Sequence, residues 1–342
     1  MNAHQSPKGE YVSSLMGVAK RIALLRVLAL PVSLALGAFP LASAAAAFPD
    51  RPIQMVVPFA AGGGLDSNAR AFGQALAKIV KVPVVVVNTA GAAGSIGLSQ
   101  VARAPADGYT LAFTPAVSLT SEPHRVKTIK YNLDSFTPVC QVFDNIFAVV
   151  VAGDSPYRTI GDLIEKARSK PNAVSYGTSG MGSIPHLGMS DIEAATKVQL
   201  THIPYKGDGP MLQDLLGGQI EVGAMLASSI SGQIESGKLR LLAVFSDQRH
   251  PGFPNVPTVK EAGVPVVQLS FGGILLPANA PPAVLKVLQE ACAQAMKSPN
   301  YLEWASRAGQ VLEYQPSTAF AKKIREDSTA KETTIKRLDL RD

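Results

Sequence analysis

The chain has 342 residues, of which 46% are hydrophobic and 17% charged, a balance typical of a globular protein and not of a disordered one. Its formal net charge of +6 includes +3 from residues 1–47 alone, and no basic cluster with interleaved aromatic residues follows, which argues against a nucleic-acid partner. The five histidines and two cysteines lack the spacing of metal ligands, so neither a metal nor a cofactor is expected.

The first 47 residues have the order of a cleavable secretory signal. A basic stretch ends at Arg26, an apolar run follows over residues 27–41, and small residues fill positions 42–47. A membrane anchor is the alternative, but the apolar run is shorter than the ~20 residues of a spanning helix and contains two prolines. We therefore expect residues 1–47 to be removed and the protein to be periplasmic.

From Phe48 onwards, short apolar strands alternate with amphipathic helices, the pattern of an α/β fold with mainly parallel sheets. Thr159 and Asp162 have the spacing of a capping box and predict the start of one helix. The expected strands are 53–57, 84–87, 109–113, 147–151, 174–176, 200–204, 221–225 and 239–244. The expected helices include 65–79, 160–167, 282–297 and 316–337.

Two successive series of strand–helix units predict two lobes. Residues 48–148 form the first part of lobe 1 and residues 149–270 form lobe 2. After residue 271 we expect helices without new strands, and such helices need an existing sheet to cover. We therefore assign residues 271–342 to lobe 1 as a return segment. Two connections between the lobes would then act as a hinge suited to closing around a ligand.

The two cysteines are too few for a disulfide scaffold. Cys140 lies in a strand-like run and Cys292 on the apolar face of a predicted helix. We favour two buried free thiols, with a single disulfide as the alternative.

Two enzyme motifs, a phosphate-binding loop and a serine nucleophile elbow, are matched only in part by this sequence. The Gly-x-x-x-x-Gly-Lys match at 232–238 is followed by Leu239 instead of Ser or Thr, and it lies between a helix and a strand in the wrong order for a phosphate loop. No complete Gly-x-Ser-x-Gly elbow is present, although Ser95, Asp154 and His186 have the chain order of a hydrolase triad. We therefore expect no catalytic residues, and keep a periplasmic serine hydrolase of small esters as the alternative function.

Four loops instead share a glycine-rich composition just ahead of a predicted helix. Glycine lets backbone N–H groups approach a ligand closely, and a helix N-terminus adds free donors and a partial positive charge. Several such loops facing one cleft would bind an anion without a metal. The four loops are residues 59–64, 91–94, 178–183 and 205–210.

These loops resemble the signatures of the Bug (TctC-like) family, the extracytoplasmic receptors of tripartite tricarboxylate transporters. The resemblance extends over residues 48–340. The matching stretches are Phe48-Pro49, Arg51-Pro52-Ile53, Pro58-Phe59 with Gly62-Gly63, Asp66 and Arg70, residues 91–97, 106–110 and 176–180, His186-Leu187, residues 204–207 and 214–218, Pro257-Thr258, and residues 261–263. One departure is Asn88-Thr89-Ala90, which replaces the Arg-Pro usual before the second glycine turn.

The resemblance implies a two-lobed periplasmic-binding-protein fold with the ligand cleft between the lobes. It implies a solute-binding protein, not an enzyme, that captures a small carboxylate such as a di- or tricarboxylate, an amino acid or an aromatic acid. Its partners would be the membrane components of the transporter, and we expect a monomer. The ligand-binding residues it implies are Phe59, Ala60, Gly62, Gly63, Asp66, Ala93, Thr114, Ser118, Thr178, Ser179, Ser183, His186, Tyr205, Lys206 and Asp208.

Several of these residues have a second interpretation. Asp66 and Arg70 are four residues apart on one helix, so an ion pair is as plausible as a ligand contact. His186 could pack against or cap its own helix. Tyr205 could belong to the core as easily as to a pocket wall.

Overall fold

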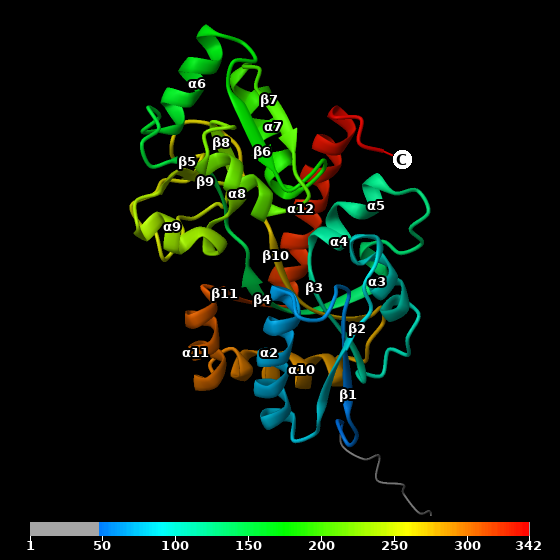
Figure 1. Ribbon diagram of the computed structural model, residues 1–342. Coiled ribbons are helices and arrows are strands. Elements are labelled where there is room, and N and C mark those ends of the chain that lie inside the picture. Colours follow the sequence, from blue (N-terminus) through cyan, green and yellow to red (C-terminus); the bar gives the residue numbers. More distant parts are fainter. Residues whose placement is uncertain (1–47, 342) are drawn as a thin grey trace, which may run out of the picture. The chain divides into compact units, whose positions relative to one another are not determined.

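A computed structural model describes residues 48–341 of the chain, and these residues belong to one compact unit. The predicted secretory signal lies outside the described residues. The described part contains two separate sheets with helices on their faces (Figure 1). This confirms the α/β, two-lobed fold class.

The first sheet has six strands, and it is mixed. Strands β1, β2 and β3 pair in parallel, whereas β10 pairs antiparallel with both β3 and β4, and β11 pairs antiparallel with β4. Across the sheet the order is β11 (Val311–Pro316), β4 (Phe136–Asp144), β10 (Phe271–Pro277), β3 (Thr110–Pro115), β1 (Ile53–Val57) and β2 (Val84–Asn88).

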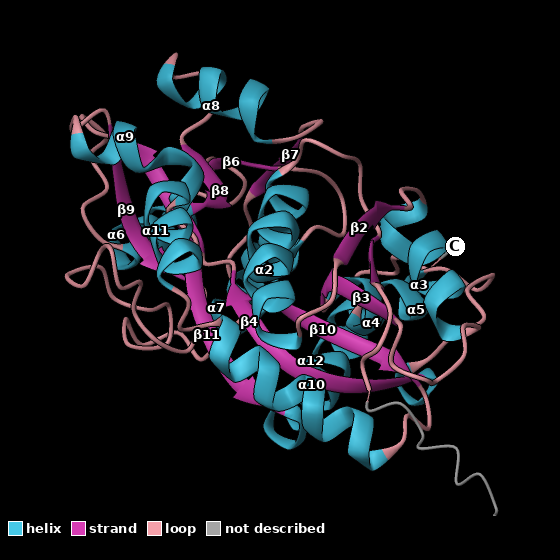
Figure 2. Ribbon diagram, turned by 90° about the horizontal axis from the view of Figure 1, so that it is seen from below, coloured by secondary structure: helices cyan, strands magenta, loops and turns pink. Residues whose placement is uncertain are grey.

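Helices cover both faces of this sheet, because its strands are apolar on both faces (Figure 2). In β1, Met55 packs with α2 and α10, and the neighbouring Val56 packs with α3 and α12 on the opposite face. The helices associated with this sheet are α2 (Gly64–Val80), α3 (Ser95–Ala102), α4 (Val117–Thr120), α5 (Glu122–Arg125), α10 (Pro282–Ala295), α11 (Pro299–Ala308) and α12 (Ser317–Arg337).

The second sheet has five strands, of which β6, β7 and β8 pair in parallel and β5 pairs antiparallel with β8 and β9. The predicted capping box opens its first helix: the Thr159 hydroxyl accepts the N–H of Asp162 at 3.2 Å, and the Asp162 carboxylate accepts the N–H of Thr159 at 2.9 Å. The elements are β7 (Thr201–Pro204), β6 (Ser175–Thr178), β8 (Val222–Leu226), β5 (Phe147–Ala152), β9 (Leu239–Val244), α6 (Ile160–Ser169), α7 (Ile184–Thr196), α8 (Asp208–Leu216) and α9 (Ser231–Glu235).

Two expectations about the sheets need correction. The sheets are mixed instead of mainly parallel in their pairing. In the first sheet β10 and β11 run opposite to the other four strands, and in the second sheet β5 is inserted between two strands that share a direction. The segment after residue 271 also contributes two strands, β10 and β11, where only helices were expected. Strand β10 is buried along its whole length, so it has no alternation of apolar and polar residues to reveal it.

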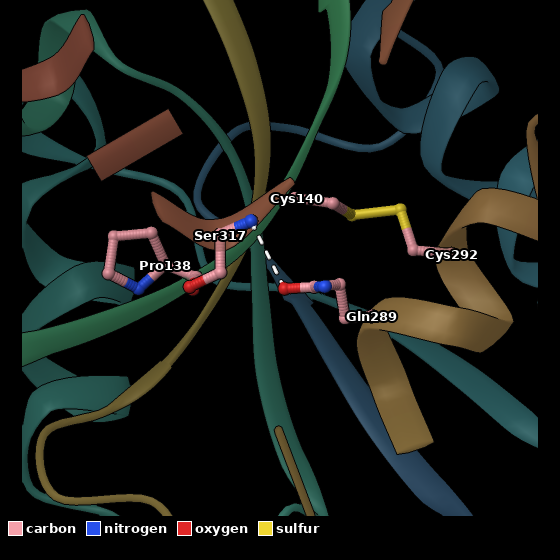
Figure 3. The surroundings of a disulfide bond; sticks show 5 residues. All are labelled: Pro138, Cys140, Gln289, Cys292 and Ser317. Atoms are coloured by element: carbon pink, nitrogen blue, oxygen red, sulfur yellow. Dashed lines mark hydrogen bonds between the residues drawn. A yellow bond between two sulfur atoms is a disulfide. The ribbon is translucent and has the colours of Figure 1, made fainter. Parts of the chain in front are cut away.

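Cys140 of β4 and Cys292 of α10 form a disulfide, so the favoured prediction of two free thiols is wrong (Figure 3). The two residues are 152 positions apart in the chain, yet their Cα atoms lie 6.7 Å apart because α10 packs on the sheet at β4. Nearby, Ser317 at the start of α12 donates its backbone N–H to Gln289 of α10 and its hydroxyl to the carbonyl of Pro138. These contacts hold α10, α12 and β4 together.

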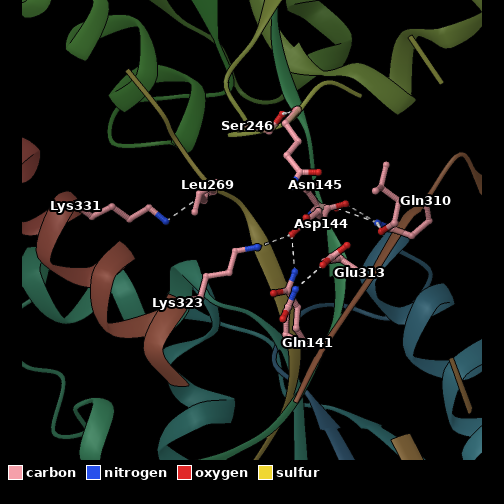
Figure 4. Close-up of polar contacts among 12 residues, drawn as sticks. Gln141, Asp144, Asn145, Ser246, Leu269, Gln310, Glu313, Lys323 and Lys331 are labelled. Atoms are coloured by element: carbon pink, nitrogen blue, oxygen red, sulfur yellow. Dashed lines mark hydrogen bonds and ion pairs between the residues drawn. The ribbon is translucent and has the colours of Figure 1, made fainter. Parts of the chain in front are cut away.

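The two connections between the sheets lie side by side. The N–H of Asn145, between β4 and β5, donates to the carbonyl of Ser270, just before β10, at 2.6 Å. Helix α12 contacts both connections (Figure 4). Its Lys323 ammonium lies 3.3 Å from the Asp144 carboxylate, and its Lys331 ammonium donates to the carbonyl of Leu269 at 3.1 Å.

Candidate functional site

The glycine-rich loops of the first sheet gather at one edge of the sheet. Strands β1, β2 and β3 are parallel neighbours, so the loops that follow them lie together, the position where open α/β sheets bind ligands. A Cβ added to Gly94 would lie 2.6 Å from the hydroxyl oxygen of Ser118 and 3.3 Å from the ring of Phe59. The Ser118 hydroxyl also donates to the carbonyl of Ala93 at 2.9 Å. The structure therefore brings the predicted site residues Phe59, Ala93 and Ser118 together.

Asp66 holds the first of these loops in place. Its buried carboxylate accepts the backbone N–H of Gly62 at 2.9 Å, the guanidinium of Arg70 at 3.0 Å and the side-chain amide of Asn88 at 2.9 Å. The hydrogen bond from Arg70, with those from Gly62 and Asn88, lowers the pKa of Asp66 to about 2 against the opposing effect of burial. The ion-pair interpretation of Asp66 is thus confirmed, although the carboxylate is buried and not on the surface.

Asn88 was missed as a site residue, although it organises this loop. Its amide donates to the carbonyl of Phe59 at 3.1 Å as well as to Asp66. The available signal was its position at the carboxyl end of β2, where a polar residue follows four valines.

The two candidate glycines of this loop, Gly62 and Gly63, differ in backbone conformation. Gly62 has φ +84°, which disfavours any other residue. Gly63 has an ordinary φ of −79°, and a Cβ added to it would make an ordinary contact, 3.6 Å from the carbonyl oxygen of Ala60. Within the described chain, the N–H groups of the exposed Ala60 and Gly63 donate to no protein acceptor. Thr114 lies deeper, buried in β3, with its hydroxyl donating to the carbonyl of Pro115.

A second cluster lies at the carboxyl ends of β6 and β7, which are parallel neighbours. The Ser183 hydroxyl donates to the carbonyl of Gly180 at 2.7 Å, and the buried Thr178 hydroxyl lies 2.7 Å from Nε2 of His202. The N–H of Tyr205 donates to the carbonyl of Thr178 at 2.9 Å, which joins the two loops. The predicted residues of these loops are therefore neighbours in space.

His186 supports the start of α7. Its Nδ1 accepts the backbone N–H of Gly182 at 3.0 Å, and its ring stacks on His202 with the ring centroids 4.3 Å apart. Burial first, and then the charges of His202, Arg125 and Arg337, lower the pKa of His186 to about 4, so the ring is neutral at pH 7. The packing and capping interpretation of His186 is the one that the geometry supports. His202 was not predicted, because a lone histidine in a strand carries no sequence signal.

The remaining predicted residues belong to the two loops of the second cluster. The Tyr205 hydroxyl donates to the Asp214 carboxylate at 2.7 Å, and Lys206 is exposed. Asp208 begins α8, where partial burial raises the pKa of its carboxyl. The N–H of Ser179 donates to no acceptor in the described part of the protein.

The chemistry that this arrangement offers is hydrogen bonding to an anion. Over residues 48–341, no three His, Cys, Asp or Glu side chains are placed to hold a metal ion. No hydrogen bond joins Ser95, Asp154 and His186 within the same residues, and Nδ1 of His186 is already engaged by Gly182. Of the described helices, none has both the length and the hydropathy needed to cross a membrane.

Comparisons with known proteins agree with one another. The model of the tripartite tricarboxylate transporter family receptor matches residues 68–340. A Cupriavidus necator protein named for its position in the gbd 5′ region is 32% identical over 319 residues, which is 93% of this chain and 97% of that protein. A TctC solute-binding protein from Polaromonas, solved without ligand, superposes with a TM-score of 0.79 at 30% identity, covering 85% of this chain and 99% of that one.

An R. palustris protein solved with adipate superposes with a TM-score of 0.69 at 29% identity, covering 84% of this chain and 97% of that one. The family match spans most of the described residues, and the Polaromonas structure shares both fold and sequence with them. The chain therefore belongs to the receptor family of the tripartite tricarboxylate transporters, as a TctC-type solute-binding receptor.

Proposed function

We propose that this protein captures a small carboxylate between two lobes and delivers it to the membrane components of a tripartite tricarboxylate transporter. The observation that carries the proposal is the pair of loop clusters at the carboxyl edges of the parallel strands, with unengaged N–H groups at Ala60, Gly63 and Ser179. Such donors suit a carboxylate, and the R. palustris relative holds a dicarboxylate, adipate.

The proposed binding set divides into two kinds of residue. Polar groups that already bond within the protein, such as those of Asp66 and His186, are proposed to shape the loops. Unengaged amides and accessible hydroxyls are proposed to contact the ligand. Residues 48–148 with 271–342 would move as one lobe and residues 149–270 as the other.

We also propose that the protein acts in the periplasm as a monomer, after residues 1–47 are removed. The test is expression in a Gram-negative host, followed by fractionation and N-terminal sequencing. Mature protein beginning between Ala45 and Phe48 in the periplasmic fraction is expected. Retention of residues 27–44 in the membrane pellet would contradict the secretion proposal.

A thermal-shift screen tests the binding function itself. The protein is first unfolded, dialysed and refolded to remove any co-purified ligand, and then heated with a panel of mono-, di- and tricarboxylates. A ligand at ~100 times its Kd stabilises the folded state by about 2.7 kcal/mol, a shift that is readily measured. If no acid shifts the melting temperature and the protein hydrolyses a p-nitrophenyl ester, the receptor function is contradicted and the serine-hydrolase alternative is favoured.

A further inference from the structure

Helices α2 and α11 lie side by side and form the walls of a surface groove of about 520 Å³ (Figure 1). Two hydrogen bonds join the walls: the Trp304 indole donates to the Ser67 hydroxyl at 3.2 Å, and the Tyr301 hydroxyl donates to the Asn68 side chain at 2.7 Å. The groove is therefore preformed. The side chains that line it recur every three or four positions along each helix and include Arg70, Gln74 and Lys78 of α2 and Glu303, Trp304 and Arg307 of α11.

The cations of this groove have hydrogen-bonding capacity to spare. In the part of the chain that the structure describes, Lys78 makes no ion pair. Arg70 uses Nε and Nη2 for Asp66 and Asn88, and its Nη1 donates to no acceptor in the same part of the chain. Arg307 pairs with Glu303 at 3.6 Å, with the two side chains 72% and 68% exposed, so this ion pair is weak. The groove therefore favours an occupant that carries carboxylates.

The aromatic side chain in the groove favours a protein as that occupant. Trp304 is half-buried and stacks on Tyr301, with the ring planes 4° apart. Tryptophan and arginine supply much of the binding energy at protein interfaces, and a helical segment commonly binds in a groove between helices. A flat anionic membrane surface suits the groove less well, because the groove is recessed and Glu303 would repel lipid phosphates.

The position of the groove relates it to the ligand loop of the first cluster. Helix α2 begins at Gly64, directly after that loop. Arg70 lines the groove and also holds the Asp66 carboxylate, which in turn accepts the N–H of Gly62. A protein bound in the groove would therefore contact the guanidinium that supports the ligand loop. This is a suitable place for a partner that receives the ligand.

We propose that the groove between α2 and α11 docks an acidic segment of the transporter's membrane components. The inference rests on the proposed function and identifies the surface of this chain that meets that partner. Aspartate or glutamate side chains of the segment would bind Lys78, Arg307 and the free Nη1 of Arg70, and an apolar side chain between them would pack on Trp304.

Docking can be measured with proteoliposomes that contain the purified membrane components. The receptor is taken from the periplasmic fraction and loaded with the acid that gives the largest thermal shift, and its binding is followed by flotation. Protein-free vesicles of phosphatidylcholine and of phosphatidylglycerol show what the lipid alone binds. Hydroxyl-radical footprinting with mass spectrometry then locates the contact. Trp304 is the single tryptophan of the chain, and its oxidation should fall at least about threefold on docking.

Charge reversal tests the groove directly. The double variant Lys78→Glu/Arg307→Glu should weaken docking at least about 10-fold, because it places like charges opposite the acidic segment, and should change carboxylate affinity less than about twofold. The control is Lys170→Glu/Arg325→Glu, which changes the net charge equally. Lys170 is exposed on the second sheet's side, and Arg325, like Arg307, is an exposed partner of one carboxylate. The control should dock like the wild type, and circular dichroism checks that both double variants are folded.

Several results would overturn the docking surface while leaving the receptor function intact. These are a wild type that binds carboxylates but not the proteoliposomes, unchanged docking of Lys78→Glu/Arg307→Glu, and equal weakening by the control. Equal binding to phosphatidylglycerol vesicles without protein would assign the groove to the membrane surface instead. If no acid of the panel binds the wild type, the proposed function fails and the docking surface fails with it.

Discussion

Replacing His186 by glutamine should flatten the dependence of stability on pH between pH 7 and 5. In the folded protein the pKa of His186 is lowered from 6.5 to about 4, mainly by burial. The unfolded chain therefore binds a proton in this range that the folded chain does not. The contribution of His186 to stability is full above pH 6.5 and is lost as pH falls towards 4. Over this range the histidine takes up a proton in the unfolded chain but not in the folded one, so acid favours unfolding.

The size of the effect follows from the shift. Each unit of pKa difference corresponds to about 1.4 kcal/mol, so the full shift is worth up to about 3 kcal/mol, of which about 2 kcal/mol falls between pH 7 and 5. A glutamine oxygen could still accept the N–H of Gly182 but cannot titrate. The pKa values of His124, His202 and His250 are also lowered by burial, so the variant should keep part of the slope.

Urea unfolding followed by circular dichroism at pH 7, 6 and 5 measures the difference. The wild type should lose about 2 kcal/mol more than His186→Gln over this range. The measurements stop at pH 5 so that Asp66 does not contribute to the slope. Its pKa is lowered to about 2, so its own contribution to stability is lost only below about pH 4. Identical slopes for the two proteins would show that His186 titrates in the folded state as it does in the unfolded one, and the buried-ring argument would be refuted.

Three other substitutions test the scaffold and the loops. The double variant Cys140→Ser/Cys292→Ser should lose about 2–5 kcal/mol of unfolding free energy, and reductant should lower the Tm of the wild type but not of the variant. Gly62→Ala should cost about 1–2 kcal/mol of stability and weaken carboxylate binding, because the left-handed conformation disfavours a Cβ, whereas Gly63→Ala should be close to neutral in the same melting and calorimetry experiments. Lys206→Gln should change affinity less than about fivefold, since an exposed lysine is screened by salt; complete loss of binding would mean a direct salt bridge to the ligand.

Local patterns predicted the secondary structure well where a strand or helix carries its own signal. Strand β1 has the predicted bounds, and α6 begins at the predicted capping box. The loops of the candidate site were also visible, because glycine between a strand and a helix is a local feature. The missed strands β10 and β11 lack such features, since one is uniformly buried and the other uniformly half-buried.

The sequence by itself determined the fold class, the family and the loops that form the two clusters, because strand–helix alternation and glycine-rich turns depend on neighbouring residues. Only the tertiary structure decided which distant residues meet. It paired Cys140 with Cys292 across 152 positions, and it placed Arg125 on Gly182. Contacts between distant residues depend on how helices pack on the sheets, and no local pattern of residues encodes that packing.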